Sequence, residues 1–106
     1  MNSKVFTILA ELRDRLKVLY GTRLVRVVLY GSQARGDAEP GSDIDVLVVL
    51  EGVVSPCEEI SRTEDDVADI SLKYDEAVAC VFVSNEEFEQ ERSPLLLNVH
   101  REGISV

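Results

Sequence analysis

The segment from Asp43 to Leu50 places the strongest constraint on the fold of this chain. After Asp45 it continues Val-Leu-Val-Val-Leu, so the residues that would face either side of a strand are all apolar. An unbroken apolar run of this length is typical of a strand whose two faces are both covered by other elements. We therefore expect Asp43–Leu50 to be a central strand of a sheet.

Helices and further strands are predicted on both sides of that strand. Apolar residues recur at three- and four-residue steps from Val5 to Leu19, which predicts an amphipathic helix that ends near Gly21. Serine-proline and capping-box patterns predict three more helix starts. The remaining predicted elements are strands at Leu24–Tyr30 and Ala77–Val83, helices from Ser55 to about Lys73, from Ser84 and from Ser93 to Gly103, and an extension at Ile104–Val106.

This order of elements indicates a small α/β (α+β) domain. We expect a small mixed sheet of three to four strands with helices packed on it. The length of 106 residues suits a single domain spanning residues 1–106, and an apolar content of 45% is enough for one core.

The charge balance bears on the partners of the chain. It has 20 acidic and 11 basic residues, a net charge of −9. Because proteins hold DNA or RNA through basic side chains, we expect no nucleic-acid partner. Nucleotide binding is still permitted, since a divalent metal can supply positive charge locally.

Neither a membrane span nor a disulfide framework is expected. Charged residues interrupt the first fifteen positions, unlike a signal peptide, and the longest uncharged apolar run, Ala77–Val83, is too short to cross a bilayer. Cys57 and Cys80 have neither CxxC spacing nor a neighbouring histidine. The sequence predicts a cytoplasmic protein with reduced thiols.

Asp43 and Asp45 are the first candidates for chemistry. Two residues apart on a predicted strand, they project from the same face. Their Cα atoms would lie roughly 6.5–7 Å apart, so the carboxylates can lean together onto a metal ion. Mg²⁺ is commonly held by one or two carboxylates together with substrate phosphates, which makes it the expected metal. The alternative interpretation is a solvated strand end.

Gly31, Ser32 and Arg35 form the second candidate group. Gly31 ends the preceding predicted strand, where a glycine permits close approach of a phosphate and the free amides of a helical turn attract anions. The Ser32 hydroxyl can donate to a phosphate oxygen, and Arg35 lies one turn further on. We include Ser42, beside Asp43, in the predicted nucleotide site. The alternatives are an ordinary turn at Gly31 and a surface cation at Arg35.

A family resemblance rests on these residues. The pattern resembles the signature of the DNA polymerase β-like nucleotidyltransferase superfamily. It consists of Gly31-Ser32, ten intervening residues, and Asp43-Ile44-Asp45 within an apolar segment. The stretch GSQARGDAEPGSDIDVLV resembles the minimal (MntA-like) nucleotidyltransferases, which are commonly antitoxin partners of HEPN-domain proteins. The resemblance is strong over Val25–Leu50 and weaker over Ser93–Ile104.

The resemblance implies a reaction and roles for these residues. Ser32 would hold the triphosphate of ATP, and Asp43 and Asp45 would bind two Mg²⁺ ions. AMP would pass from ATP to a hydroxyl group, with release of pyrophosphate.

One departure from the family pattern separates the functional alternatives. Active members carry a third carboxylate on a later strand, but the matching strand, Ala77–Val83, contains no acid. Asp75 and Glu76 precede it and could substitute, although turn positions are the simpler interpretation. Without a base, the acceptor hydroxyl would lose a contribution of about 10²–10⁴ in rate.

Two main hypotheses remain, with the enzyme narrowly favoured. The first is Mg²⁺-dependent transfer of AMP from ATP to a protein hydroxyl, with the chain as antitoxin of a HEPN-domain toxin. The second is a weakly active or inactive binding module that neutralises its partner by contact. Transfer to a small molecule is less favoured, because those enzymes usually carry an extra helical domain. The sequence predicts no such helical domain here, so we expect the acceptor pocket to be completed by a partner or by a second copy in a homodimer.

Overall fold

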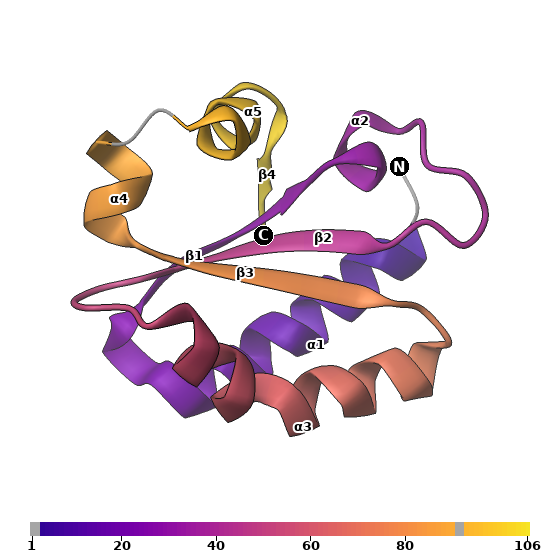
Figure 1. The fold of residues 1–106 in the computed structure, drawn as a ribbon. Coiled ribbons are helices and arrows are strands. Elements are labelled where there is room, and N and C mark those ends of the chain that lie inside the picture. Colours follow the sequence, from indigo (N-terminus) through magenta and orange to yellow (C-terminus); the bar gives the residue numbers. More distant parts are fainter. Residues whose placement is uncertain (1–2, 91–92) are drawn as a thin grey trace.

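The computed structural model describes residues 3–90 and 93–106 of the chain (Figure 1). The elements in chain order are α1 (Ser3–Tyr20), the 3₁₀ turn η1 (Gly21–Arg23), β1 (Leu24–Tyr30), α2 (Ser32–Arg35), β2 (Ile44–Leu50), α3 (Pro56–Tyr74), β3 (Val78–Ser84), α4 (Asn85–Gln90), α5 (Pro94–Glu102) and β4 (Ile104–Ser105). The predicted mixed α+β class is confirmed.

The four strands form one mixed sheet in the order β3-β2-β1-β4. Strand β1 is antiparallel to both β2 and β4, whereas β2 and β3 are parallel. The expectation of a central strand is confirmed, because β2 lies between β1 and β3 and every residue from Val46 to Leu50 is fully buried.

Helices cover both faces of the sheet and explain the unbroken apolar run. Helices α1 and α3 lie on one face, and α4 and α5 lie on the other (Figure 1). Val46, Val48 and Leu50 point into the core beneath α1 and α3. Leu47 and Val49 belong to the second core, beneath α4 and α5. Alternate β2 side chains therefore serve two separate cores.

Two strand starts differ from the sequence prediction by one residue. Strand β2 begins at Ile44, where the amide of Ile44 donates to the Ala77 carbonyl at 2.8 Å, so Asp43 lies just before the strand. Strand β3 runs one residue later than predicted, over Val78–Ser84.

The predicted serine caps behave differently from one another. At Ser93 the hydroxyl accepts from the Leu96 amide at 3.3 Å, and at Ser84 it accepts from the Glu87 amide at 3.1 Å. Ser55 also precedes a first-turn proline, but its side chain makes no capping hydrogen bond. Both serines have the extended backbone that is usual at an N-cap, so the backbone class does not distinguish them.

Strand β1 begins with an irregularity. The pairing with β2 shifts between Leu24 and Arg26, which leaves Val25 39% exposed as a bulge. Across residues 3–90 and 93–106, no helix has the length and apolar character that a membrane crossing requires.

Candidate nucleotide and metal site

Antiparallel pairing of β1 and β2 builds the centre of the candidate site. Tyr30, the last residue of β1, lies opposite Asp45 near the start of β2. Gly31 therefore comes beside the Asp45 carboxylate: a Cβ atom built on Gly31 would lie 2.6 Å from Asp45 Oδ2. Gly31 also has a φ of 77° and a ψ of −156°, a conformation almost restricted to glycine. Two independent constraints therefore require glycine at this position.

The helical turn α2 follows Gly31 directly. The amides of Ala34 and Arg35 both donate to the Gly31 carbonyl at 3.1 Å, which makes them the first hydrogen bonds of the turn. The amides of Ser32 and Gln33 precede these bonds, and the first amides of a helix have no acceptor within it. Together with the Ser32 hydroxyl, these amides are suited to an anion.

The two aspartates are close enough to influence each other. Asp43 is exposed and Asp45 is half-buried. Burial raises the pKa of the Asp45 carboxyl above its ordinary value, the charge of Asp43 adds to the rise, and Arg35 opposes it. A divalent cation between the carboxylates would offset both the burial and the repulsion.

The chemistry of this pair fits Mg²⁺. Among the described residues, no group of three or more histidine, cysteine or acidic side chains is arranged to hold a metal ion. Asp43 and Asp45 would therefore supply only part of a coordination shell. A shell with few protein carboxylates, completed by phosphate oxygens and water, is the usual arrangement for Mg²⁺.

Arg35 is held by two acidic residues in this structure. Its Nη1 lies 3.0 Å from Glu102 Oε1 on α5, and its Nε lies 3.2 Å from Asp37 Oδ2. The hydrogen bonds that Arg35 donates to Asp37 and Glu102 raise the pKa of Arg35. The predicted role of Arg35 in phosphate binding would require it to leave or share these partners.

Ser42 closes the loop that separates α2 from β2. Its hydroxyl accepts from the Glu39 amide at 3.1 Å, and its own amide donates to the Glu39 carbonyl at 3.0 Å. Gln33 Nε2 donates to the Ser42 carbonyl at 3.5 Å. Ser42 therefore fixes the approach of the chain to Asp43, and its role at a nucleotide stays a prediction.

The strand beside Asp45 carries no acid on the same face. Ala79 is the β3 partner of Asp45, and parallel pairing places both side chains on the α4–α5 side of the sheet. Asp75 ends α3 in a left-handed conformation with a φ of 53°, and Glu76 pairs with Lys4 at 3.3 Å. These contacts give both acids structural roles, in agreement with the simpler interpretation.

Sequence reasoning missed the contribution of α5 to this region. Glu102 lies 67 residues from Arg35 in the chain, and its local sequence predicts only a helix end. Gln33 and Asp37 stand inside the motif, but nothing in their spacing indicates which neighbour each contacts. Gln33 and Asp37 have their partners within the same segment, Ser42 and Arg35, whereas only the fold brings Glu102 of α5 to Arg35.

Comparisons with known proteins agree with this geometry. The nucleotidyltransferase domain family matches residues 9–99. A candidate protein adenylyltransferase of Methanocaldococcus jannaschii, MJ0141, is 32% identical over 72 residues, which cover 68% of this chain and 72% of that protein.

Solved structures show the same fold. A candidate minimal nucleotidyltransferase superposes with a TM-score of 0.59 at 25% identity, over 96% of this chain and 95% of the other. A toxin–antitoxin structure with AMP-PNP superposes with a TM-score of 0.62 at 19% identity, over 97% of this chain and 69% of the other. The family match spans most of the chain and includes Gly31, Ser32, Asp43 and Asp45, so the chain belongs to the nucleotidyltransferase domain family.

Proposed function

We propose that this chain is a Mg²⁺-dependent nucleotidyltransferase that moves AMP from ATP to a hydroxyl group of a partner protein. The observation that carries the proposal is the close approach of Gly31 to Asp45: a Cβ atom on Gly31 would lie only 2.6 Å from Asp45 Oδ2. It brings the turn that we propose binds phosphate and a carboxylate that we propose binds the metal to one point. The protein adenylyltransferase name of the Methanocaldococcus jannaschii relative supports ATP as donor and protein as acceptor.

Each residue of the site would have a defined task. The amides of Ser32 and Gln33 and the Ser32 hydroxyl would bind phosphate oxygens. Asp43 and Asp45 would hold Mg²⁺, which supplies neutralising charge for the triphosphate. Arg35 would exchange an acidic partner for a phosphate oxygen. Positioning and charge neutralisation are the main sources of catalysis in this class of reaction.

The bond changes follow from this placement. The acceptor oxygen would form a bond to the α-phosphorus of ATP, the bond between the α-phosphorus and the bridging oxygen would break, and pyrophosphate would leave. The acceptor proton would pass to water or to a base of the partner, because Ala79 opposite Asp45 cannot accept it.

The partner we propose is a HEPN-domain toxin, with this chain as its antitoxin. The family resemblance and the fold shared with a toxin–antitoxin structure support that choice. A second copy of this chain is the other candidate for completing the acceptor pocket.

One alternative deserves the same test. In this alternative the chain is a weakly active or inactive binding module, which neutralises its partner by contact and not by transfer of AMP. The acid-free β3 and the pairing of Arg35 with Asp37 and Glu102 favour this alternative.

The deciding experiment measures transfer of α-³²P-labelled AMP from ATP to the protein encoded beside this chain, with and without Mg²⁺. The test variant is Asp43→Asn/Asp45→Asn, and the matched control is Asp14→Asn/Asp65→Asn, which changes two exposed aspartates outside the site. We expect label on the partner with the wild type and the control only. No labelling, with the complex formed and ATP bound, would support the binding module.

A further inference from the structure

The outer edge of β1 is only partly covered. Strand β4 pairs with β1 at Val28 and Leu29, and the amide of Val106 adds a hydrogen bond to the Val27 carbonyl at 3.0 Å. In the described part of the chain, no strand lies along this edge from Leu24 to Arg26. We call this uncovered edge, with the side chains around it, the β1 notch.

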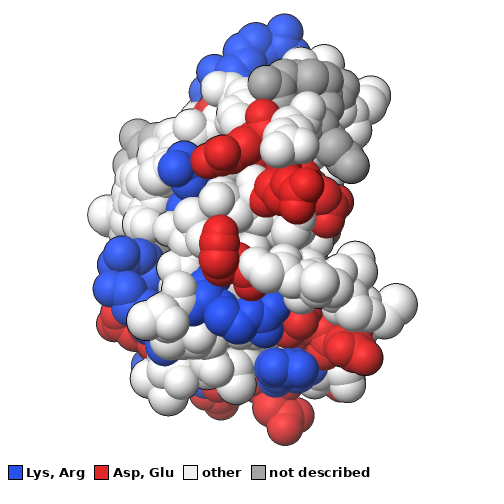
Figure 2. Space-filling view, turned by 90° about the vertical axis from the view of Figure 1, so that its left-hand side faces the viewer, with Lys and Arg blue, Asp and Glu red and all other residues white. Residues whose placement is uncertain are grey.

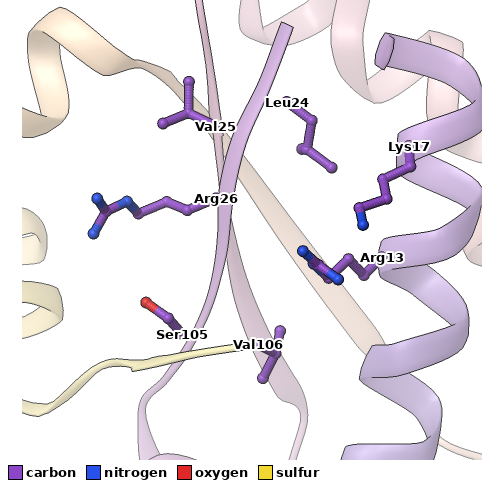
Figure 3. Close-up of a pocket in the computed structure, with 7 residues that line it drawn as sticks. All are labelled: Arg13, Lys17, Leu24, Val25, Arg26, Ser105 and Val106. Carbon is purple, nitrogen blue, oxygen red and sulfur yellow. The ribbon is translucent and has the colours of Figure 1, made fainter. Parts of the chain in front are cut away.

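A hollow of about 350 Å³ lies at the β1 notch (Figure 3). Its lining comes from α1, the beginning of β1 and the end of the chain segment that contains β4. A second hollow of about 300 Å³ shares Arg13, Ser105 and Val106 with the first and continues along α1 to Phe6, which is 38% exposed. The two hollows together make an elongated surface with an apolar end.

Three cations surround the β1 notch from two sides. Figure 3 shows Arg13 and Lys17 of α1 on one side of β1 and Arg26 on the opposite side. Arg26 lies over the Phe88 ring, 5.2 Å from its centroid. The three charges therefore do not converge on one point, which disfavours a compact anion such as a single phosphate.

These three cations differ from the basic residues that are neutralised by carboxylates. Arg15, Arg35 and Lys73 each pair with carboxylates, although the chain has 20 acidic residues. No carboxylate of the described residues lies within ion-pair distance of the three cations at the β1 notch. Among the residues that the structure describes, Asp14 is the one acid that lines the second hollow.

We infer that the β1 notch binds an extended, acidic segment of another protein, which adds a strand to the free edge of β1. Neighbouring side chains of an added strand point to opposite faces of the sheet. Two adjacent acidic residues would therefore meet Arg26 on one face and Arg13 with Lys17 on the other. Backbone pairing supplies affinity, and the charges select the partner.

Other occupants fit the β1 notch less well. Two copies of this chain paired through the notch by a two-fold axis would bring like cations together. A nucleic acid would meet a net charge of −9, and Figure 2 shows acidic and basic side chains interspersed on the face that it presents. The notch is also at the opposite end of β1 from Gly31, so the inference does not depend on the proposed function.

The test uses a fluorescein-labelled decapeptide with blocked ends, composed of Val and Thr with two adjacent Glu residues at its centre. We expect saturable binding by fluorescence anisotropy. The matched peptide with two Lys residues should not bind. Hydrogen exchange should show protection of amides within Leu24–Arg26 when the acidic peptide is bound.

Protein variants distinguish binding at the β1 notch from attraction of the peptide by the net charge of the protein. Arg13→Glu/Lys17→Glu should weaken binding of the acidic peptide by about tenfold or more, since it reverses both charges on one face. Lys4→Glu/Arg101→Glu makes the same change in net charge at exposed positions and should stay within about twofold. Circular dichroism checks that each variant folds.

Three results would overturn the inference. They are no binding of the acidic peptide by the wild type, equal losses in both double variants, and amide protection outside β1. Competition by a single-stranded oligonucleotide at equal affinity would instead assign the β1 notch to nucleic acid. None of these results depends on ATP, so failure here is distinguishable from failure of AMP transfer.

Discussion

Arg35 and Glu102 join two elements that are distant in the chain, with 3.0 Å between Arg35 Nη1 and Glu102 Oε1. The pair connects α2, which follows Gly31 of the candidate site, to the last turn of α5. The same guanidinium contacts Asp37 and opposes the rise in the pKa of Asp45. Arg35 is therefore shared between structural contacts and the candidate metal site.

The first prediction concerns the competition between Glu102 and a bound phosphate for Arg35. Glu102→Gln should tighten binding of Mg²⁺-ATP a few-fold, because Arg35 becomes freer to contact a phosphate. Arg35→Ala should weaken the same binding. Asp45→Asn should change ATP affinity in the presence of Mg²⁺ more than in its absence. Isothermal titration calorimetry measures all three.

The control for this prediction is stability. The Arg35–Glu102 pair is solvent-exposed, so Glu102→Gln should lower the free energy of unfolding by less than about 1 kcal/mol. Weaker ATP binding by Glu102→Gln would contradict the idea that Glu102 restrains Arg35, and would indicate that Glu102 positions it.

The second prediction concerns Gly31. Gly31→Ala should lower the free energy of unfolding by about 3 kcal/mol, because the new Cβ meets Asp45 and the backbone conformation is strained. Gly36→Ala is the matched control, with a φ of 82° but no atom within 4 Å of the new Cβ. It should cost only about 1 kcal/mol.

A double-mutant cycle separates the contact from the strain. In an Asp45→Ala background, Gly31→Ala should lose its excess cost over Gly36→Ala, as measured by urea unfolding. An undiminished cost would mean that backbone conformation alone requires the glycine.

The third prediction concerns the missing carboxylate. Ala79 is the β3 partner of Asp45, so Ala79→Asp places an acid beside the proposed metal-binding pair. If the acceptor lacks a base, transfer of AMP should rise by about 10² or more. Ala79→Asn has the same shape without the base and should not raise the rate. An equal rise in both variants would refute general-base catalysis as the cause.

The fourth prediction follows from the raised pKa of Asp45, whose ordinary value is 3.8. The folded state binds the Asp45 proton more tightly than the unfolded state. Stability therefore falls as the pH rises through the window above 3.8, and the cost persists at neutral pH.

Asp45→Asn should accordingly raise the urea midpoint at pH 7 and leave it nearly unchanged at pH 3, where both states are protonated. Added Mg²⁺ should stabilise the wild type more than the variant, since a bound ion favours the folded state. A gain of equal size at both pH values would show that packing, and not charge, is responsible.

The sequence was sufficient for those parts of the fold that depend on local pattern. The apolar run of Val46–Leu50 predicted a strand covered on both faces, and the structure places Val46, Val48 and Leu50 in one core and Leu47 and Val49 in the other. Periodicity is informative here because each side chain must point to one face or the other.

Details set by long-range contacts could not be read in this way. Asp43 lies outside β2 because the first ladder bond forms between Ile44 and Ala77, more than thirty residues further along the chain. Ser55 fits a capping pattern, but its side chain makes no capping hydrogen bond. The Arg35–Glu102 pair depends on the packing of α5, which no local motif encodes.

The order of elements has a consequence for how such a site can diversify. Gly31, Ser32, Asp43 and Asp45 all lie between the end of β1 and the first residues of β2, so the nucleotide half of the proposed site is encoded by one continuous stretch. Strand β3, which would border the proposed acceptor side, arrives only after the crossover through α3. In the proposed function, substitutions on β3 would therefore alter the choice of acceptor and leave the residues proposed to bind the nucleotide unchanged.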